Sequence, residues 1–361
     1  MEMYKDLCSN ENLLSAFKKA RKGKTQVFYV KEFEKNLLEN IFQLKVELHF
    51  QIYKPKPLVH FMIKDPKRRK ISKSDFRDRV VHHGLYNKIE PLFEKSFIYD
   101  SYANRKGKGT LKALERFNTF KRKVSKNNTR TCYILKADIK KYFETVDHRV
   151  LLALLKRRIH EEKILWLIKI ILDNHHTKEK EKGMPLGNLT SQFFANVYLH
   201  ELDFFVKQKL KAKYYIRYVD DFVIFHHSKN ALKIWKSEIN DFLRNNLLLG
   251  LHPEKSKIIF LEQGIDFLGM RIFPYHKLLR KRNIKHFLRK KECLYTLYKE
   301  KICNYEDIYN FLEGWQAYAS HANTYKLRKK LGIEIEKHFS KELSSKEVNK
   351  YLKLSKPPKP S

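Results

Sequence analysis

Apolar residues recur at intervals of three and four along most of this chain, a spacing that predicts amphipathic helices. The first such segment runs from Met1 to about Leu48, where Phe33, Leu37 and Ile41 keep the helical interval. Further helices are predicted over residues 76–97, 149–171, 193–210 and 229–249, and after a Gly- and Lys-rich loop at 101–110.

Short apolar runs that predict strands lie between these helices. Pro55 and Pro57 forbid a helix ahead of "LVHFMI", so this run and the one after the turn "DPKRRK" predict a basic β-hairpin. Further strands are predicted at 133–138, where "YILKAD" ends on Asp138, on both sides of "YVDD" at 218–221, and on both sides of Gly264. No βαβ unit repeats at a fixed period, so an α+β sheet core is predicted.

The C-terminal part of the sequence carries a helical apolar stripe within a strongly basic segment. From residue 276 to residue 301 there are ten Lys or Arg and two Glu. A helix with one apolar and one cationic face fits the phosphate backbone of a duplex. More helices are predicted to about residue 340, and residues 341–361 are predicted to form a basic, disordered tail. The predicted duplex contacts are Arg280, Lys281, Arg282, Lys285 and Arg289.

Charge narrows the choice of partner. The 361 residues include 76 Lys and Arg against 40 Asp and Glu, a formal net charge of +36, which favours a polyanionic partner. No run of about 18 uncharged apolar residues occurs, so we expect no membrane span and a cytoplasmic location. The four cysteines have no CxxC spacing, which argues against a disulfide framework or a zinc site.

Two adjacent carboxylates, Asp220 and Asp221, interrupt the apolar run "YIRYVDDFVIF". We predict that they form the two-residue connection of a β-hairpin, because Asp tolerates the left-handed backbone of a tight turn. Two buried carboxylates at one tip need cations, and Mg²⁺ is the cation that prefers oxygen ligands. Asp138, at the end of another predicted strand, is the candidate third ligand.

Three carboxylates could hold two Mg²⁺ ions, an arrangement that serves nucleotidyl transfer. A nuclease uses the same two-metal arrangement to deliver water, so the carboxylates alone leave both activities open. Taken alone, the Asp220-Asp221 pair would be better interpreted as a solvent-facing turn, and Asp138 taken alone as an unrelated aspartate.

Seven segments, in order from about residue 50 to residue 275, resemble the motifs of reverse transcriptases. They are "RRKIS" with "FRDRVVHH", "SYANRKGKG", "LKADIKKYF", "MPLGNLTSQFFANVYLHELD", "YVDD" preceded by "IR", "LHPEKSK" and "FLGMRI". The resemblance implies a right-hand polymerase fold. Residues 1–130 would form an N-terminal helical segment and the fingers, residues 131–275 the palm, and residues 276–340 a helical thumb ahead of the 341–361 tail.

The same resemblance implies roles for individual residues. Asp138, Asp220 and Asp221 match the metal ligands, with the carbonyl of Ile139 as an additional oxygen. Phe143 matches the aromatic gate that leaves no room for a 2′-hydroxyl and so selects deoxynucleotides. The resemblance further implies triphosphate contacts from Arg69 and Lys255, template-backbone contacts from Arg105, Gly107 and Gly109, and nucleotide contacts from Leu186, Gly187 and Gln192.

One motif separates the subfamilies. Most bacterial reverse transcriptases resemble each other in having Pro-Gln-Gly followed by Ser-Pro, whereas this chain has Leu186 in place of that glutamine and Gln192 in place of that proline. This combination resembles the reverse transcriptases of diversity-generating retroelements. It implies low fidelity at template adenines, a structured template RNA and a small basic accessory variability protein. A retron-like, group II intron-like or defence-associated lineage is the alternative, and an inactive RNA-binding scaffold is the non-enzyme alternative.

Overall fold

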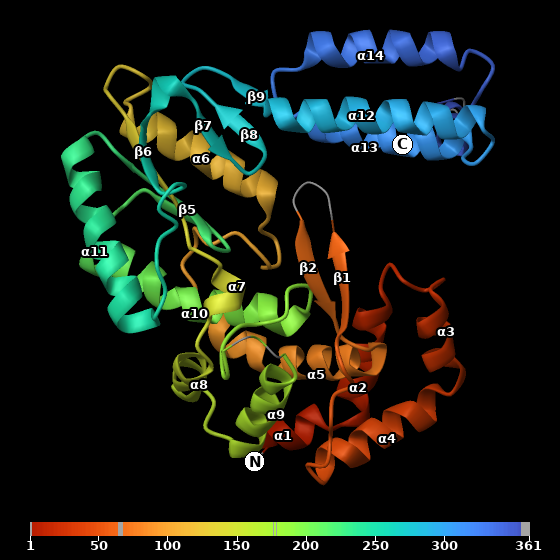
Figure 1. Cartoon of the computed structure of the whole chain (residues 1–361). Helices are drawn as coiled ribbons and strands as arrows, with labels where there is room; N and C mark the ends of the chain where they lie inside the picture. Colours follow the sequence, from red (N-terminus) through yellow and green to blue (C-terminus); the bar gives the residue numbers. More distant parts are fainter. Residues whose placement is uncertain (1, 64–67, 176, 178, 355–361) are drawn as a thin grey trace, which may run out of the picture. The chain divides into compact units, whose positions relative to one another are not determined.

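The computed structural model describes residues 2–63, 68–175, 177 and 179–354, with the backbone alone for residues 353 and 354. The chain divides into two compact units, Met1–Ile259 and Phe260–Ser361 (Figure 1). The first unit combines helices with an antiparallel sheet, and the second combines a small sheet with helices. The predicted mixed α+β composition is therefore confirmed.

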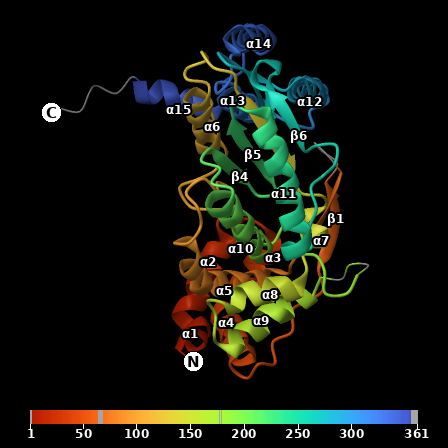
Figure 2. The ribbon, with the colours of Figure 1, turned by 90° about the vertical axis from the view of Figure 1, so that its left-hand side faces the viewer.

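A four-stranded sheet lies at the centre of the first unit. Its order is β4 (Tyr215–Tyr218), β5 (Asp221–His226), β3 (Tyr133–Asp138) and β6 (Lys257–Phe260). The sheet lies between α6 (Thr110–Val124) and α11 (Lys229–Leu247), as Figure 2 shows. Because side chains alternate along a strand, Phe225 of β5 packs edge-on against Phe117 of α6, while its neighbour Ile224 joins the main core cluster with α11.

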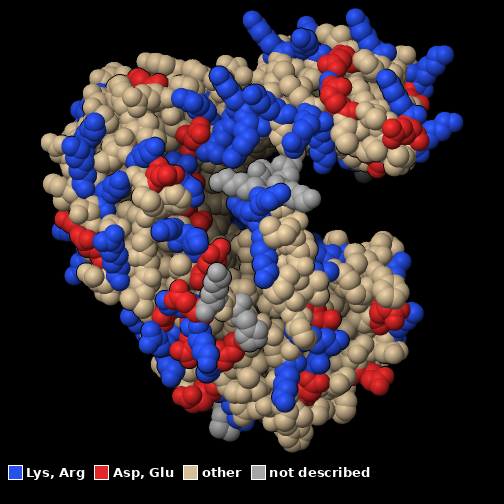
Figure 3. Space-filling model, viewed as in Figure 1, with Lys and Arg blue, Asp and Glu red and all other residues tan. Residues whose placement is uncertain are grey.

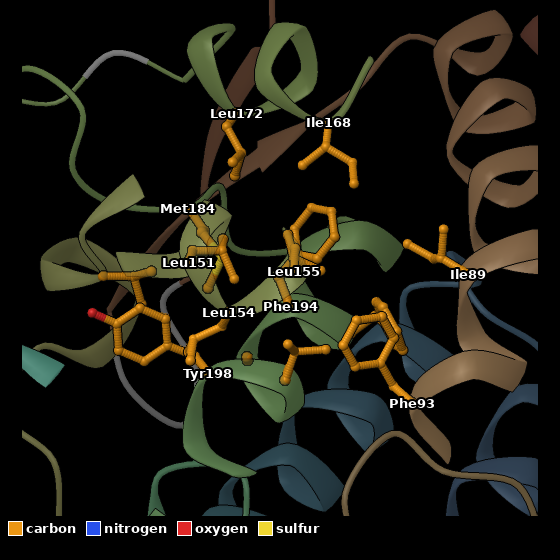
Figure 4. Packing of buried hydrophobic residues seen from close by; sticks show 14 of the residues in the cluster. Ile89, Phe93, Leu151, Leu154, Leu155, Ile168, Leu172, Met184, Phe194 and Tyr198 are labelled. Carbon is orange, nitrogen blue, oxygen red and sulfur yellow. The ribbon is translucent and has the colours of Figure 1, made fainter. Parts of the chain in front are cut away.

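Helices α5 (Phe76–Glu94), α8 (His148–Lys156), α9 (Glu162–Asp173) and α10 (Leu189–Phe204) supply a large part of the main core. Figure 4 shows side chains from all four meeting in this core. A single turn of π-helix, Phe205–Lys209, continues α10, and the short helix α7 (Tyr142–Thr145) follows β3. The core thus fixes α10 and β3, the two elements on which the candidate site is built.

The apolar spacing predicts one helix over residues 149–171, and this prediction is wrong in one respect. The chain forms two helices, α8 and α9, separated by residues 157–161. Glu161 immediately precedes α9, and its carboxylate accepts hydrogen bonds from the backbone N–H groups of Met3 and Tyr4, each at 3.0 Å. The break lets the apolar faces of α8 and α9 pack on each other, a tertiary effect that periodicity does not encode.

The N-terminal helices and the basic hairpin agree with the sequence pattern. The predicted helical entry segment comprises α1 (Glu2–Leu7), α2 (Asn10–Arg21), α3 (Phe28–Lys35) and α4 (Leu37–His49). Strands β1 (Val59–Ile63) and β2 (Arg69–Lys73) pair antiparallel, with Ile63 opposite Arg69. Residues 65–67 of the predicted turn "DPKRRK" lie outside the described residues, and its last two residues, Arg69 and Lys70, belong to β2.

The second unit begins at Phe260 with the 3₁₀ turn Leu261–Gln263 and a three-stranded antiparallel sheet. Its strands are β7 (Ile265–Phe267), β8 (Met270–Ile272) and β9 (Lys277–Leu279). Helices α12 (Lys281–Lys299), α13 (Tyr305–Ala319) and α14 (Tyr325–His338) follow. The boundary between the compact units at 259–260 precedes the palm–thumb boundary inferred at 275–276, because β7–β9 cluster with these helices.

The prediction of a disordered tail from residue 341 is wrong for part of its length. Ser345–Leu354 forms helix α15, and the backbone N–H of Ser345 donates to the Glu306 carboxylate at 2.7 Å. Residues 355–361 lie outside the described residues. Among the helices in the described part of the chain, none is long and apolar enough to cross a membrane.

Candidate active site

The β4–β5 hairpin is displaced by one residue from its predicted turn. Tyr218 pairs with Asp221, so the two-residue connection is Val219 and Asp220, and Asp221 is the first residue of β5. The left-handed residue is Val219, with φ of 55°, and neither aspartate. A β-branched residue rarely adopts this conformation, which costs on the order of 1–3 kcal/mol and persists only where surrounding contacts enforce it.

The sheet register brings the three aspartates together. Asp138, the last residue of β3, lies directly opposite Asp221 of β5. The backbone N–H of Ile139 donates to the carbonyl of Asp220 at 3.2 Å. Asp220 and Asp221, which follow Asp138 by more than 80 positions in the chain, therefore lie beside it at one edge of the sheet. All three aspartate side chains are half-buried.

Electrostatics couple these carboxylates. The pKa of Asp220 is raised to about 6, first by burial and then by the neighbouring charge of Asp138, while Lys255 and Arg69 oppose the shift. Arg69, the predicted triphosphate ligand at the start of β2, is thus close enough to Asp220 for its charge to be felt. A raised carboxyl pKa at a site with a second carboxylate marks a place that a cation would stabilise.

Lysines engage two of the aspartates. Lys255 Nζ lies 3.2 Å from Asp138 Oδ2, and Lys136 Nζ lies 3.9 Å from Asp221 Oδ2. With the side chains so placed, no three His, Cys, Asp or Glu in the described ranges form a group that would hold a metal ion. The donor set still fits Mg²⁺, because three half-buried carboxylates lie at adjacent strand ends. The raised pKa of Asp220 shows that the neighbouring positive charges do not fully stabilise its ionised form.

The raised pKa of Asp220 predicts a pH-dependent stability difference. Because its folded-state pKa, about 6, exceeds its ordinary value of 3.8, the ionised carboxylate destabilises the metal-free fold. This penalty is absent below about pH 4, grows between pH 4 and 6, and is complete above pH 6. We expect Asp220→Asn to be more stable than the wild type at pH 7 in EDTA and equally stable near pH 4. Urea unfolding at both pH values measures this, and equal differences at both would contradict it.

A fully buried ion pair between Arg217 and Asp203 stabilises the strained backbone at Val219. Arg217 binds Asp203 of α10 with two hydrogen bonds, Nε to Oδ1 at 2.7 Å and Nη2 to Oδ2 at 2.6 Å, and both side chains are 0% exposed. Arg217 Nη1 donates to the carbonyl of Val219 at 3.1 Å. The guanidinium therefore holds the left-handed residue that directs Asp220 and Asp221.

The same arginine also joins the hairpin to the loop at 100–103. Its Nη1 donates to Asn196 Oδ1 at 3.1 Å, and Asn196 Nδ2 donates to the carbonyl of Ala103 at 2.9 Å. On the backbone, Arg217 N–H donates to the carbonyl of Asp100, and Tyr102 N–H donates to the carbonyl of Arg217, both at 3.0 Å. The loop predicted to contact the template is thus fixed to the strand that leads into the Val219–Asp220 turn.

The predicted template contact of Arg105 needs correction. Its side chain is 7% exposed, pairs with Glu94 at 2.7 Å and donates to the carbonyls of Ile98 and Ser101. A guanidinium with these partners shapes the loop and cannot reach a phosphate without breaking them. Gly107 and Gly109 have φ of 69° and 112°, with open space where a side chain would lie, so the backbone remains accessible there. Their template role stays a proposal.

The segment around Leu186 contacts the basic hairpin. The carbonyl of Leu186 accepts from Ser72 N–H at 3.0 Å, and a Cβ on Gly187, whose φ is 115°, would lie 2.8 Å from Ile71. Glycine is therefore required at 187 for this close approach. Gln192 lies half-buried in the first turn of α10.

Phe143 is attached to the same segment through its backbone. Its ring packs partly against the main core, and its carbonyl accepts from Met184 N–H at 2.6 Å. The predicted sugar gate and the predicted nucleotide-binding segment thus share a backbone hydrogen bond. Both roles stay predictions.

The predicted duplex-binding cations lie on and beside α12. Lys281, Arg282, Lys285 and Arg289 are exposed, and Figure 3 shows Lys and Arg projecting from the α12–α14 region. Arg280 instead pairs with Asp266 at 3.4 Å and precedes the helix. Leu288 is 38% exposed, and the stem of Lys291 takes the buried position between Phe287 and Tyr295. The cationic face is therefore present, with a narrower apolar stripe than predicted.

Comparison with known proteins identifies the family. Residues 54–272 match the model of the family described as reverse transcriptase (RNA-dependent DNA polymerase). The chain is 27% identical over 280 residues to protein YkfC of Escherichia coli, covering 66% of this chain and 71% of YkfC. It is 25% identical over 305 residues to the group II intron-encoded protein LtrA of Lactococcus lactis, covering 65% of this chain but only 50% of LtrA.

Among solved structures, the chain is similar to apo telomerase from Candida tropicalis, with a TM-score of 0.46 and 15% identity, covering 61% of this chain and 48% of that chain. Telomerase from Candida albicans, solved with a fragment of telomeric RNA, gives a TM-score of 0.47 and 12% identity, covering 69% of this chain and 52% of that one. The family match covers more than half of the sequence and includes all three aspartates. The chain belongs to the reverse transcriptase family.

Proposed function

We propose that this protein is an RNA-directed DNA polymerase whose Asp138, Asp220 and Asp221 carboxylates, with the Ile139 carbonyl, hold two Mg²⁺ ions. The observation that supports this most directly is the register that places Asp138 opposite Asp221 within a reverse transcriptase domain. Bound there, Mg²⁺ would supply activation of the attacking 3′-hydroxyl and stabilisation of the leaving pyrophosphate. Lys255, which pairs with Asp138 at 3.2 Å, would then be available to contact the triphosphate.

We assign substrate selection to residues around this site. Arg69 suits the triphosphate, because a forked guanidinium matches phosphate oxygens and its charge already acts on Asp220. Phe143 would exclude a 2′-hydroxyl through its ring. The exposed cations of α12 would contact the phosphates of the RNA–cDNA duplex without reading its sequence.

We further propose that the enzyme copies its template with low fidelity at adenines, as in diversity-generating retroelements. Leu186 supports this, because leucine offers only dispersion and shape where a glutamine amide would hold the nascent base pair by hydrogen bonds. On this proposal the partners are a structured template RNA and a small basic accessory protein. A retron-like, group II intron-like or defence-associated enzyme is the alternative. The similarity to LtrA supports the group II intron-like form of this alternative.

Leu186→Gln tests the fidelity proposal. One restored hydrogen bond is worth about 1–2 kcal/mol, so we expect errors opposite template adenines to fall roughly 5- to 30-fold. Errors opposite the other three bases should change much less. Deep sequencing of cDNA made by both enzymes on one template measures this, and an unchanged adenine error rate would reject the contribution of Leu186.

Primer extension tests the polymerase activity itself. The full chain is given its native RNA, a primer annealed to an RNA template, deoxynucleotides and Mg²⁺, beside a reaction in EDTA. We expect extension that requires the metal and that discriminates against ribonucleotides. Metal-dependent cleavage of the template without extension would instead identify a nuclease, and RNA binding with neither reaction would identify a scaffold.

A further inference from the structure

A groove on the surface of the first unit lies between α11 and the loop at 251–256 that precedes β6. Its volume is about 400 Å³. Lys233, Lys236 and Arg244 line it from the helix, and His252 and Ser256 line it from the loop. None of the predicted nucleotide or duplex contacts is among these lining residues, although the groove adjoins the candidate active site, because His252 N–H donates to the backbone carbonyl of Asp138 at 2.7 Å.

The lining is selective for an anion. It contains three Lys or Arg side chains and no Asp or Glu among the described residues that form it. Ser237 and Asn240 add neutral polar groups on the same face of α11. Lys236 Nζ donates to the carbonyl of Ser256 at 2.6 Å, which fixes its ammonium at the groove and leaves further N–H donors for a ligand.

The loop side of the groove contains a polar atom that has no partner. His252 Nδ1 is buried, and no hydrogen bond is found for it within the described part of the chain. A buried ring nitrogen without a partner is uncommon, because leaving it unpaired costs free energy. The loop is attached to β3, because His252 N–H donates to the carbonyl of Asp138 at 2.7 Å.

The length of the cationic row indicates the kind of anion. Lys233 and Arg244 are eleven positions apart on one helix. At 1.5 Å per residue they are separated by about 16 Å along the axis, which is too far for one phosphate or one nucleotide to bridge. Successive phosphates of a polynucleotide cover such a span, and Leu251 and Pro253 offer apolar surface for its sugars.

We propose that this groove binds the phosphodiester backbone of folded RNA outside the template–primer duplex. The inference rests on the proposed function, since it takes the RNA partner from there, and it adds a second RNA site. An RNA held here is anchored beside the loop that carries Lys255 and contacts Asp138, so the template RNA stays bound while its copied portion moves through the active site.

The test compares Lys233→Glu/Arg244→Glu with a control that loses the same charge, Lys18→Glu/Lys22→Glu, where both lysines are exposed at the end of α2. The probes are single-stranded polyuridylate and a short RNA–DNA hybrid with a recessed primer. We expect the groove variant to bind polyuridylate roughly tenfold more weakly, with a salt dependence reduced by about two ion equivalents. The control should keep the wild-type salt dependence, and both variants should extend the hybrid at the wild-type rate.

Three results would overturn the proposal. Equal loss of polyuridylate binding in the control would show that net charge alone is responsible. Competition by millimolar inorganic phosphate as effective as that by RNA phosphates would show a small-anion site. Slower extension of the hybrid by the groove variant would place the groove in the template–primer path. Failure of the wild type to extend the hybrid would reject the polymerase activity, while the binding measurements would still decide on the groove.

Discussion

Asp220→Asn should lower the rate of DNA synthesis by roughly 10²- to 10³-fold or more, the loss that follows removal of one group that stabilises transition-state charge. The substitution keeps the shape of the side chain and removes a charged metal ligand. Affinity for RNA should stay the same or rise slightly, because a negative charge that faces a polyanion has been removed. Single-turnover extension measures the rate, and filter binding measures the affinity.

Asp241→Asn is the matched control for this prediction. Asp241 lies exposed on α11, and its substitution removes the same charge without touching the sheet edge. We expect it to extend primers at the wild-type rate. If Asp220→Asn retained most of the activity, or if Asp241→Asn lost as much, the assignment of the metal ligands would be wrong.

Asp203→Ala should lower the free energy of unfolding by about 3–5 kcal/mol, because it leaves the guanidinium of Arg217 buried without its counter-charge. The exposed pair Lys169–Asp173 is the control, and Asp173→Ala should cost no more than about 0.5 kcal/mol. Urea unfolding of both variants measures the contrast. A cost near that of the surface pair would show that Arg217 finds other partners.

A compensated variant separates stability from the positioning of the catalytic turn. Arg217→Met with Asp203→Leu and Tyr215→Phe removes both charges and the tyrosine hydroxyl that donates to Asp203. Replacement of a buried ion pair by apolar residues is often neutral for stability, so this variant should fold. Its rate of DNA synthesis should nevertheless be lower than that of the wild type, because the Val219 carbonyl has lost the hydrogen bond from Arg217. Wild-type turnover in a stable compensated variant would show that the ion pair serves stability alone.

The sequence predicted which aspartates come together better than it predicted the geometry of the turn that carries them. Strand propensity on both sides of "YVDD" predicted the hairpin, but turn propensity favours Asp-Asp at 220–221 over the observed Val-Asp at 219–220, and only the pairing of β5 with β4 and β3 decides between them. The pairing of Asp138 with Asp221 was expected from the need for a third ligand. That need specifies the type of residue at the site. It does not predict the lysines that pair with the carboxylates, Lys255 with Asp138 and Lys136 with Asp221.

Several important residues could not be found from local patterns. Arg217 and Asp203 each look like ordinary charges in amphipathic segments, although an arginine within the apolar run at 215–225 was a signal for a buried partner. Arg105 was misassigned because a basic residue in a Gly- and Lys-rich loop suggests phosphate, whereas Glu94 pairs with it from the preceding helix. Long-range partners of this kind depend on packing and not on periodicity.

Binding of Mn²⁺ tests most directly whether the three aspartates form one ion site. Mn²⁺ accepts the same carboxylate ligands as Mg²⁺ and can be counted by electron paramagnetic resonance. We expect the wild-type chain, saturated with a template–primer and a deoxynucleotide, to bind it at least roughly tenfold more tightly than Asp138→Asn, a loss of about 1.4 kcal/mol. Equal binding by the two proteins would show that Asp138 and the Val219–Asp221 turn do not share a metal, and the proposed catalytic centre would then be wrong.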